Sequence, residues 1–241
     1  MFNPRPLIRQ LDIPGRLPVL IIDDFLLEPE KILAWADDQR AMFAVEGGNY
    51  FPGPEVTMPD PFTAQLGDFF TLHVRRLLGA RRTLEASSSL SMVTKAPAAL
   101  QPLQRICHSD TMVGPRSVNP AANEGIAASV LYLFADAALG GTSFYAPRKA
   151  PAEMAALNRH AMQCTTSQFD QVIGAPAAYL TASNDYFEQV ASVPAAFNRI
   201  IFYDGAILHS GQIDAPGRLS PDPRKGRLTL NGFFLLRKLA S

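Results

Sequence analysis

The chain has 241 residues and is 47% hydrophobic, so it can bury a sizeable core, either as one large domain or as two small ones. Its 22 basic residues balance 22 acidic residues, and a formal charge of zero argues against a surface that attracts nucleic acid. The longest apolar run, PVLIIDDFLL, is too short to span a bilayer and is interrupted by two aspartates, so no membrane partner is expected.

The N-terminus and the cysteines favour a cytoplasmic location. The opening residues, MFNPRPLIRQLDIPG, contain no apolar core of a signal peptide, so we expect none. Cys107 and Cys164 lie far apart in the sequence and do not form a disulfide framework. Reduced thiols in the cytoplasm are therefore predicted.

The first part of the chain predicts a strand and two helices. A β-branched apolar run predicts a strand over 18–26, and a proline in a first turn predicts a helix over 28–39. Glycines and prolines predict a loop over 47–61. A second helix is predicted over 61–78, ending at Gly79, because a set of apolar residues falls on one face. The members of this set are Phe62, Leu66, Phe69, Phe70 and Leu77.

After Ser87 the pattern changes to short apolar segments that proline and glycine punctuate. Short strands with turn signals are typical of a β-sandwich or jelly roll. Residues 151–186 interrupt the series and predict a helical insertion. The segments predicted as strands are 88–94, 103–110, 127–134, 142–147, 186–195, 198–210 (with a turn inside it) and 226–238.

We therefore predict a single domain, 1–241, that is mainly β with flanking helices. Residues 1–86 would supply the N-terminal strand and the supporting helices, and residues 87–241 the jelly-roll core. The sequence shows no internal repeat and no break in composition that would mark a second domain. A homodimer is a common state for chains of this size.

The tripeptide His108-Ser109-Asp110 raises the question of a metal site. In a strand, residues i and i+2 point to the same face, so the imidazole and the carboxylate would aim at one place. A second imidazole would complete the two-histidine, one-carboxylate triad that suits non-haem Fe(II) oxygenases. The tripeptide alone is a weak signal, because such a short pattern also arises by chance.

The second imidazole has to come from one of three other histidines. His73 lies in the amphipathic helix, and His160 lies beside Arg159 in the helical insertion, where we expect it to be solvated. His209 follows a strand and a turn, so a different strand could bring it to the tripeptide. A lone histidine in this position is more often a buried core residue, so the local pattern alone leaves the choice of the second imidazole open.

Five motifs follow one another from residue 108 onward: HSD (108–110), SVLYLF (129–134), GGTSFY (140–145), RIIFYDGAILHSG (199–211) and RLTLNGFF (227–234). With these motifs in this order, the chain resembles the Fe(II)- and 2-oxoglutarate-dependent dioxygenases, in particular the prolyl-4-hydroxylase-like branch, over about residues 88–236. The resemblance implies a double-stranded β-helix (a cupin-like jelly roll), with Fe(II) as the metal, 2-oxoglutarate as the co-substrate and dioxygen as the oxidant. It also implies that His108, Asp110 and His209 are the metal ligands and the catalytic centre.

The resemblance also implies a basic residue on the last strand that binds the far carboxylate of the co-substrate. Alternation places Arg227, Thr229 and Asn231 on one face of that strand, and an arginine fork fits a carboxylate. Arg218 is the rival, because it follows the distal histidine by 9 residues where the family usually has about ten, but it lies in a proline-rich loop. Tyr132 occupies the place of a family tyrosine that can also bind this carboxylate, or it is an aromatic core residue.

The implied reaction is the hydroxylation of a C–H bond in a small molecule or a peptide side chain, with formation of succinate and CO2. Two alternatives remain open. The first is a non-catalytic cupin-like protein that binds a metal or a ligand in the same barrel. The second is a structural all-β domain whose polar residues carry no chemistry.

Overall fold

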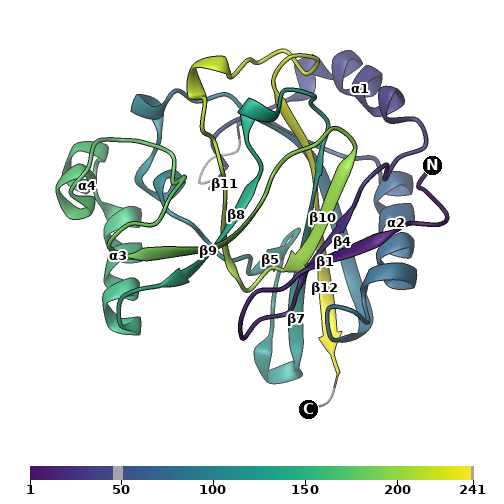
Figure 1. The fold of residues 1–241 in the computed structure, drawn as a ribbon, viewed down its shortest axis with the longest axis horizontal. Coiled ribbons are helices and arrows are strands. Elements are labelled where there is room, and N and C mark those ends of the chain that lie inside the picture. Colours follow the sequence, from purple (N-terminus) through teal and green to yellow (C-terminus); the bar gives the residue numbers. More distant parts are fainter. Residues whose placement is uncertain (46–50, 240–241) are drawn as a thin grey trace.

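A computed structural model describes residues 1–45 and 51–239. Among these residues, seven strands form one large antiparallel sheet and three form a small one (Figure 1). In spatial order the large sheet consists of β1 (Ile8–Leu11), β2 (Val19–Ile22), β10 (Arg199–Asp204), β7 (Glu124–Tyr132), β12 (Arg227–Lys238), β4 (Ala80–Val93) and β3 (Glu55–Thr57). The small sheet consists of β11 (Leu208–Gly211), β8 (Thr142–Pro147) and β9 (Phe187–Val193). A separate two-stranded ribbon consists of β5 (Met112–Val113) and β6 (Arg116–Ser117).

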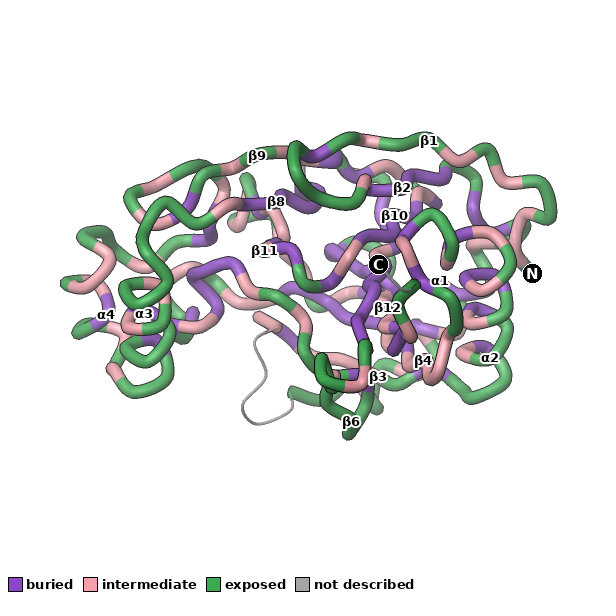
Figure 2. The backbone as a smooth tube through the Cα atoms, turned by 90° about the horizontal axis from the view of Figure 1, so that it is seen from below, coloured by how far each residue is buried: buried purple, intermediate pink, exposed green. Residues whose placement is uncertain are grey.

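The two sheets pack face to face around an apolar cluster. Tyr132 of β7 and Ile201 of β10 meet Phe144 of β8 in this cluster, and all three are fully buried. In Figure 2 the buried residues concentrate along these inner strands, while most exposed residues lie in the outer loops and on parts of the helices. The predicted mainly β jelly roll with flanking helices is confirmed.

Two helices cover the outer face of the large sheet, α1 (Pro29–Asp38) and α2 (Asp60–Phe69) (Figures 1 and 2). Both begin with a proline in the first turn, where the missing N–H costs no hydrogen bond. Phe69 of α2 packs edge-on against Phe25, with ring centroids 4.9 Å apart. The larger of the apolar clusters lies between these helices and the sheet.

The second helix differs from the prediction in its last turns. A π-helical turn over Phe70–Val74 adds one residue to the repeat, which moves the buried face by one position. Val74 and Leu78 are therefore buried, whereas Leu77, predicted on the apolar face, is 40% exposed. The chain leaves the helix at Gly79, whose φ of +67° is a left-handed conformation that glycine adopts easily.

Two further predictions about the first part of the chain need correction. β4 begins at Ala80, so the predicted border at 86/87 lies inside a strand of the large sheet. The predicted loop over 47–61 contains β3, which pairs with the middle of β4. Residues 47–50 of this loop lie outside the described residues.

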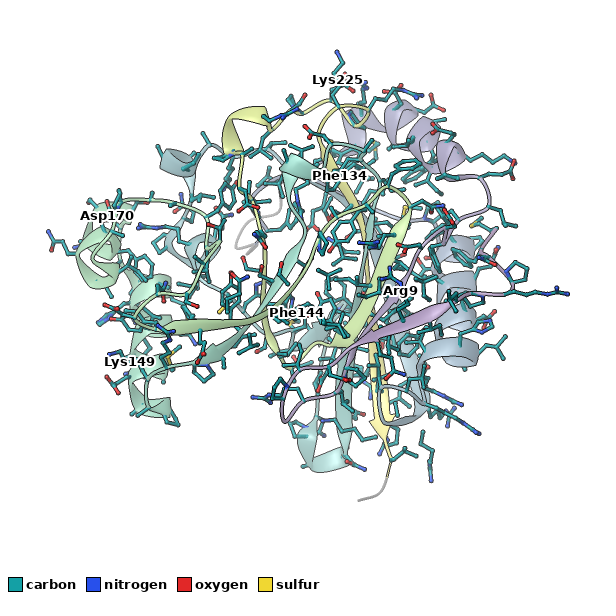
Figure 3. All side chains as sticks on the ribbon, in the orientation of Figure 1. Arg9, Phe134, Phe144, Lys149, Asp170 and Lys225 are labelled. Carbon is teal, nitrogen blue, oxygen red and sulfur yellow. The ribbon has the colours of Figure 1, made fainter. Side chains whose placement is uncertain are left out.

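The predicted insertion after β8 is helical and consists of α3 (Pro151–Gln163) and α4 (Thr166–Ile173). These helices lie at the end of the molecule opposite α1 and α2 (Figure 1), and Figure 3 labels Asp170 in α4 at this end. The side chain of Arg105, 2% exposed, pairs with Asp170 at 2.6 Å and holds α4 in place. None of the described helices is long and apolar enough to cross a membrane. Single helical turns span Arg40–Met42, Pro97–Ala99, Pro102–Arg105, Pro120–Ala122, Ala137–Leu139 and Pro216–Arg218.

Replacing Phe234 by alanine is expected to reduce the free energy of unfolding by about 3–5 kcal/mol. Phe234 lies in β12, and its fully buried ring stacks on Phe70 with centroids 4.0 Å apart. Truncation therefore leaves a cavity between the sheet and the π-helical turn Phe70–Val74. Urea unfolding measures the change. Leu72→Ala is the control, because its side chain is 77% exposed and should cost under about 0.5 kcal/mol. Equal losses in both variants would contradict this packing.

Candidate metal centre

A turn between β10 and β11 delivers His209. The backbone N–H of Ala206 donates to Oδ1 of Asp204, and the N–H of Ile207 donates to its carbonyl, at 3.0 Å in each case. β11 then pairs with β8, His209 lying opposite Phe144. The distal histidine thus lies on a strand fixed from both sides, as its position in the sequence predicts.

The tripeptide 108–110 does not form the strand that was predicted for 103–110. Residues Pro102–Arg105 form a helical turn, and His108 makes only an isolated bridge to His209. The two histidines exchange backbone hydrogen bonds of 3.1 and 2.8 Å, and the N–H of Asp110 donates to the carbonyl of Gly205 at 2.7 Å. An extended segment paired with the β10–β11 connection therefore produces the alternation that a full strand would give.

Three side chains converge on one point. His108 Nε2 lies 3.8 Å from Asp110 Oδ1, and His209 Nε2 lies 3.6 Å from Asp110 Oδ2. One ligand atom of each residue lies within 4.8 Å of the others. His73 instead packs on Phe69, with ring centroids 4.7 Å apart, and His160 is exposed on α3. The structure thus brings together the three predicted ligands and neither of the other histidines.

The ring of His209 is held in one tautomer. Its Nδ1 lies 2.9 Å from the carbonyl oxygen of Ile207, which can only accept, so Nδ1 carries the hydrogen and Nε2 keeps its lone pair. Burial lowers the pKa of His209 to about 4, and burial together with the neighbouring His209 lowers the pKa of His108 to about 4. Both imidazoles are neutral at pH 7, the form that binds metals.

The carboxylate of Asp110 gives the clearest indication that the site binds a cation. Its Oδ2 is buried and has no hydrogen-bond partner among the described residues. Burial also raises the pKa of Asp110 to about 6, because the charged form loses its hydration. A cation between the three side chains would satisfy this oxygen, since carboxylates that are buried and charged are paired or bind metals.

The donor set therefore fits a divalent transition metal. Two neutral imidazole nitrogens and one carboxylate oxygen form the facial triad of non-haem Fe(II) sites, which leaves positions open for other ligands. Cys107 lies next in the chain to His108, but it is buried in the apolar cluster around α3 and α4. Burial raises the pKa of its thiol far above the usual range, so it is a poor metal ligand.

The three ligands open into a cavity of about 680 Å³ between the two sheets. Its wall combines residues from the inner face of the large sheet with residues from β11 and from α3. The strand β12 contributes every second residue, which confirms the alternation expected for the RLTLNG motif. Those residues are Arg227, Thr229, Asn231 and Phe233.

Arg227 places a positive charge in the wall of this cavity. Its side chain is buried, its Nε lies 3.1 Å from the carbonyl of Leu139, and its Nη2 lies 2.8 Å from that of Gly141. The guanidinium also lies over the ring of Phe134, 5.7 Å from its centroid. Phe134 is labelled in Figure 3. In the described part of the chain it makes no ion pair with a carboxylate. A buried cation with only neutral partners is costly, so this geometry favours an anionic ligand in the cavity.

Of the other predicted residues, some line the cavity and others do not. Arg218 is on the surface, where it pairs with Asp136 at 2.7 Å, and it does not line the cavity. Thr229 and Asn231 line the cavity, and the amide of Asn231 donates to Ser91 Oγ at 3.0 Å. Tyr132 is fully buried behind the wall, where its hydroxyl donates to Thr142. Thr142, which sequence reasoning did not single out within GGTSFY, lines the cavity in its place.

Gly205 has a role that sequence reasoning missed. A Cβ there would lie 3.0 Å from Asp110 Oδ2, so Gly205→Ala should displace the carboxylate by a few tenths of an ångström. We expect about a tenfold loss of Mn(II) affinity, by analogy with other residues that position ligands. Gly217→Ala is the control, because a Cβ there meets nothing within 4 Å. Calorimetric titration measures both, and unchanged affinity in Gly205→Ala would contradict this close contact.

A family model identifies the family of this chain. The model described as "Family of unknown function (DUF6445)" matches residues 4–234. The chain belongs to this family. Among curated proteins, no match to the sequence is found.

Several solved structures are similar in fold to this DUF6445 member. SnoN, a non-heme alpha-ketoglutarate-dependent epimerase from nogalamycin biosynthesis, has a TM-score of 0.48 and 11% identity, over 90% of this chain and 78% of that chain. HygX from Streptomyces hygroscopicus, with nickel and 2-oxoglutarate bound, has a TM-score of 0.48 and 11% identity, over 90% and 82%. An N-substituted L-amino acid dioxygenase from Burkholderia ambifaria AMMD has a TM-score of 0.43 and 13% identity, over 98% and 96%. At these scores the likeness assigns neither a reaction nor a substrate to this chain, and the prolyl-4-hydroxylase-like branch stays a prediction.

Proposed function

We propose that this DUF6445 member is an Fe(II)- and 2-oxoglutarate-dependent dioxygenase. One observation carries the proposal: a cavity whose wall holds both a two-histidine, one-carboxylate cluster and a buried arginine that lacks an anionic partner in the described chain. A divalent metal satisfies the first feature and a small dicarboxylate the second. Both features line the same cavity, which a 2-oxo acid bound to the metal at one end and to Arg227 at the other would occupy.

Different residues of the chain would bind the metal and the co-substrate. His108, Asp110 and His209 would hold Fe(II) on one side and leave the other side for ligands. Arg227 would bind the far carboxylate of 2-oxoglutarate. Thr142 also lines the cavity, and because its Oγ1 accepts a hydrogen bond from Tyr132, its own hydroxyl hydrogen would be donated to this carboxylate. The bound iron would supply the activation of dioxygen. The apolar part of the wall would exclude water from the reacting C–H bond.

The reaction proposed is the hydroxylation of a small molecule. One atom of dioxygen enters a C–H bond of the substrate, the other enters succinate, and CO2 leaves from 2-oxoglutarate. The wide cavity is also compatible with a peptide side chain as the substrate. A cytoplasmic location, with Cys107 and Cys164 as free thiols, and a homodimeric state belong to the same proposal.

Two measurements on the 241-residue chain test the proposal. Calorimetry with the Mn(II)-loaded protein should show one bound 2-oxoglutarate, and the Fe(II)-loaded protein should form succinate only when oxygen is present. Failure of 2-oxoglutarate to bind would overturn the proposal. Binding without any succinate would replace it by the non-catalytic cupin-like alternative.

A further inference from the structure

Four arginines flank the turn between α2 and β4. Arg75 and Arg76 follow the π-helical turn, and Arg81 and Arg82 lie at the start of β4. The N–H of Ala80 donates to the carbonyl of Arg75 at 3.1 Å, so the turn brings the two pairs of arginines close together. In the described part of the chain, their side chains form neither ion pairs nor hydrogen bonds, and Arg75 Nε is buried without a partner. Arg76, Arg81 and Arg82 are exposed, so their charges are available to a partner from solution.

Like charges also face each other across the large sheet at this turn. Arg82 of β4 lies directly opposite Arg237 of β12, and such a pair is unfavourable. Two carboxylates nearby, Glu85 and Glu124, already pair with Arg116, and Glu124 also pairs with Arg237. They do not neutralise the four arginines of the turn. The chain therefore has a local positive charge here although its formal charge is zero, and an anionic partner would relieve the repulsion.

Exposed leucines surround the same turn. A Cβ at Gly79 would lie 3.8 Å from Leu17 Cδ1, and the N–H of Leu239 donates to the carbonyl of Gly79 at 2.9 Å. Leu77 lies two residues before this glycine, and Leu72 lies farther back in the π-helical turn. All four leucines are exposed. Figure 1 shows the C-terminal end of β12 beside this turn, away from α3 and α4.

The combination of arginine and leucine fits an anionic lipid surface better than nucleic acid. Guanidinium forks bind the phosphate groups of both. Proteins that bind single-stranded nucleic acid add aromatic rings on which the bases stack, whereas the large apolar side chains exposed around this turn are leucines. At a membrane surface, leucines enter the boundary between headgroups and acyl chains while basic side chains stay at the headgroups. The expectation of no membrane partner concerned spanning segments, and a surface contact needs none.

We propose that the four arginines and four leucines of this turn, the arginine–leucine surface, bind the face of an anionic lipid bilayer. Each basic residue near such a face raises the affinity about fivefold, so several together give a reversible contact. The leucines add apolar area that leaves water on binding. The inference does not depend on the proposed function, because none of these side chains lines the metal cavity.

Co-sedimentation of the 241-residue chain with lipid vesicles tests the inference. The vesicles consist of phosphatidylcholine alone, or of phosphatidylcholine mixed with the anionic lipid phosphatidylglycerol. The wild type should sediment only with the anionic vesicles. A triple variant removes three exposed charges of the arginine–leucine surface and should bind these vesicles about 100-fold more weakly. Its substitutions are Arg76→Gln, Arg81→Gln and Arg82→Gln.

Two further variants separate the position of the charges and the apolar contact from net charge. In Leu72→Gln/Leu77→Gln the charge is unchanged, and the affinity should fall at least about tenfold because two leucines no longer enter the bilayer. Thermal unfolding verifies that every variant is folded. A matched control removes three charges from exposed residues outside this surface and should bind like the wild type. Its substitutions are Arg5→Gln, Lys149→Gln and Arg159→Gln.

Equal binding to both kinds of vesicle, no binding to the anionic vesicles, or a triple variant that binds like its control would overturn the inference. A leucine variant that binds as tightly as the wild type would also overturn it, because the surface would then recognise charge alone. The same proteins are titrated with a single-stranded oligonucleotide. If the oligonucleotide binds through the three arginines and the vesicles do not bind, the surface is assigned to nucleic acid instead.

Discussion

Asp110→Ala is expected to abolish divalent metal binding and the formation of succinate. The carboxylate is the only anionic ligand of the three, and its loss leaves two neutral imidazoles. Loss of residues that merely orient metal ligands lowers affinity by about 10–100-fold, so loss of a ligand should exceed about 100-fold. Mn(II) titration followed by electron paramagnetic resonance measures the affinity, and succinate is quantified separately.

The same variant should fold without loss of stability in the absence of metal. Asp110 Oδ2 makes no hydrogen bond with the described residues, and burial of the charged carboxylate is unfavourable. Removal of this carboxylate should therefore not lower the free energy of unfolding. Thermal unfolding of metal-free protein measures this, with the exposed Asp185→Ala as the control. Metal affinity equal to that of the wild type would mean that Asp110 is not a ligand.

Arg227→Met is expected to raise the Kd for 2-oxoglutarate by at least about 30-fold, because loss of one partner of a buried charge pair costs about 2 kcal/mol or more. Arg227→Lys should also bind weakly, since an ammonium cannot reproduce the fork that contacts the carbonyls of Leu139 and Gly141. Calorimetry with Mn(II)-loaded protein measures both. Metal affinity should not change, because the guanidinium is not a metal ligand.

Arg218→Met is the matched control for this prediction. Its side chain is 61% exposed and pairs with Asp136 outside the cavity, so the Kd for 2-oxoglutarate should remain that of the wild type. A large increase in Arg218→Met, with no change in Arg227→Met, would reverse the assignment of the two arginines.

Local patterns were sufficient to predict the parts of the site that depend on alternation. The two-residue spacing of His108 and Asp110 and the inward face of β12 follow from extended backbone, and both hold in the structure. The choice of Arg227 over Arg218 as the cavity residue also followed from local context, because prolines keep Arg218 in a surface loop. The fold class followed from short strands punctuated by turns.

Features that depend on contacts between distant segments could not be predicted. The local pattern predicts a loop at Glu55, because β3 has only three residues and exists through its pairing with β4. Tyr132 lies behind the wall because Thr142, from another sheet, takes the cavity position in front of it. The need for glycine at 205 arises from the approach of Asp110, 95 residues earlier in the chain. A short stretch of sequence does not contain both partners of such a contact, so its pattern cannot predict the contact.

Diffraction at the iron absorption edge tests the central claim most directly. Crystals of the 241-residue chain would be grown without oxygen in the presence of Fe(II) and N-oxalylglycine, an inert analogue of the co-substrate. The predicted result is one strong anomalous peak bonded to His108 Nε2, His209 Nε2 and a carboxylate oxygen of Asp110, with the analogue reaching Arg227. A map without a peak between these three side chains, or with iron bound to other residues, would contradict the account.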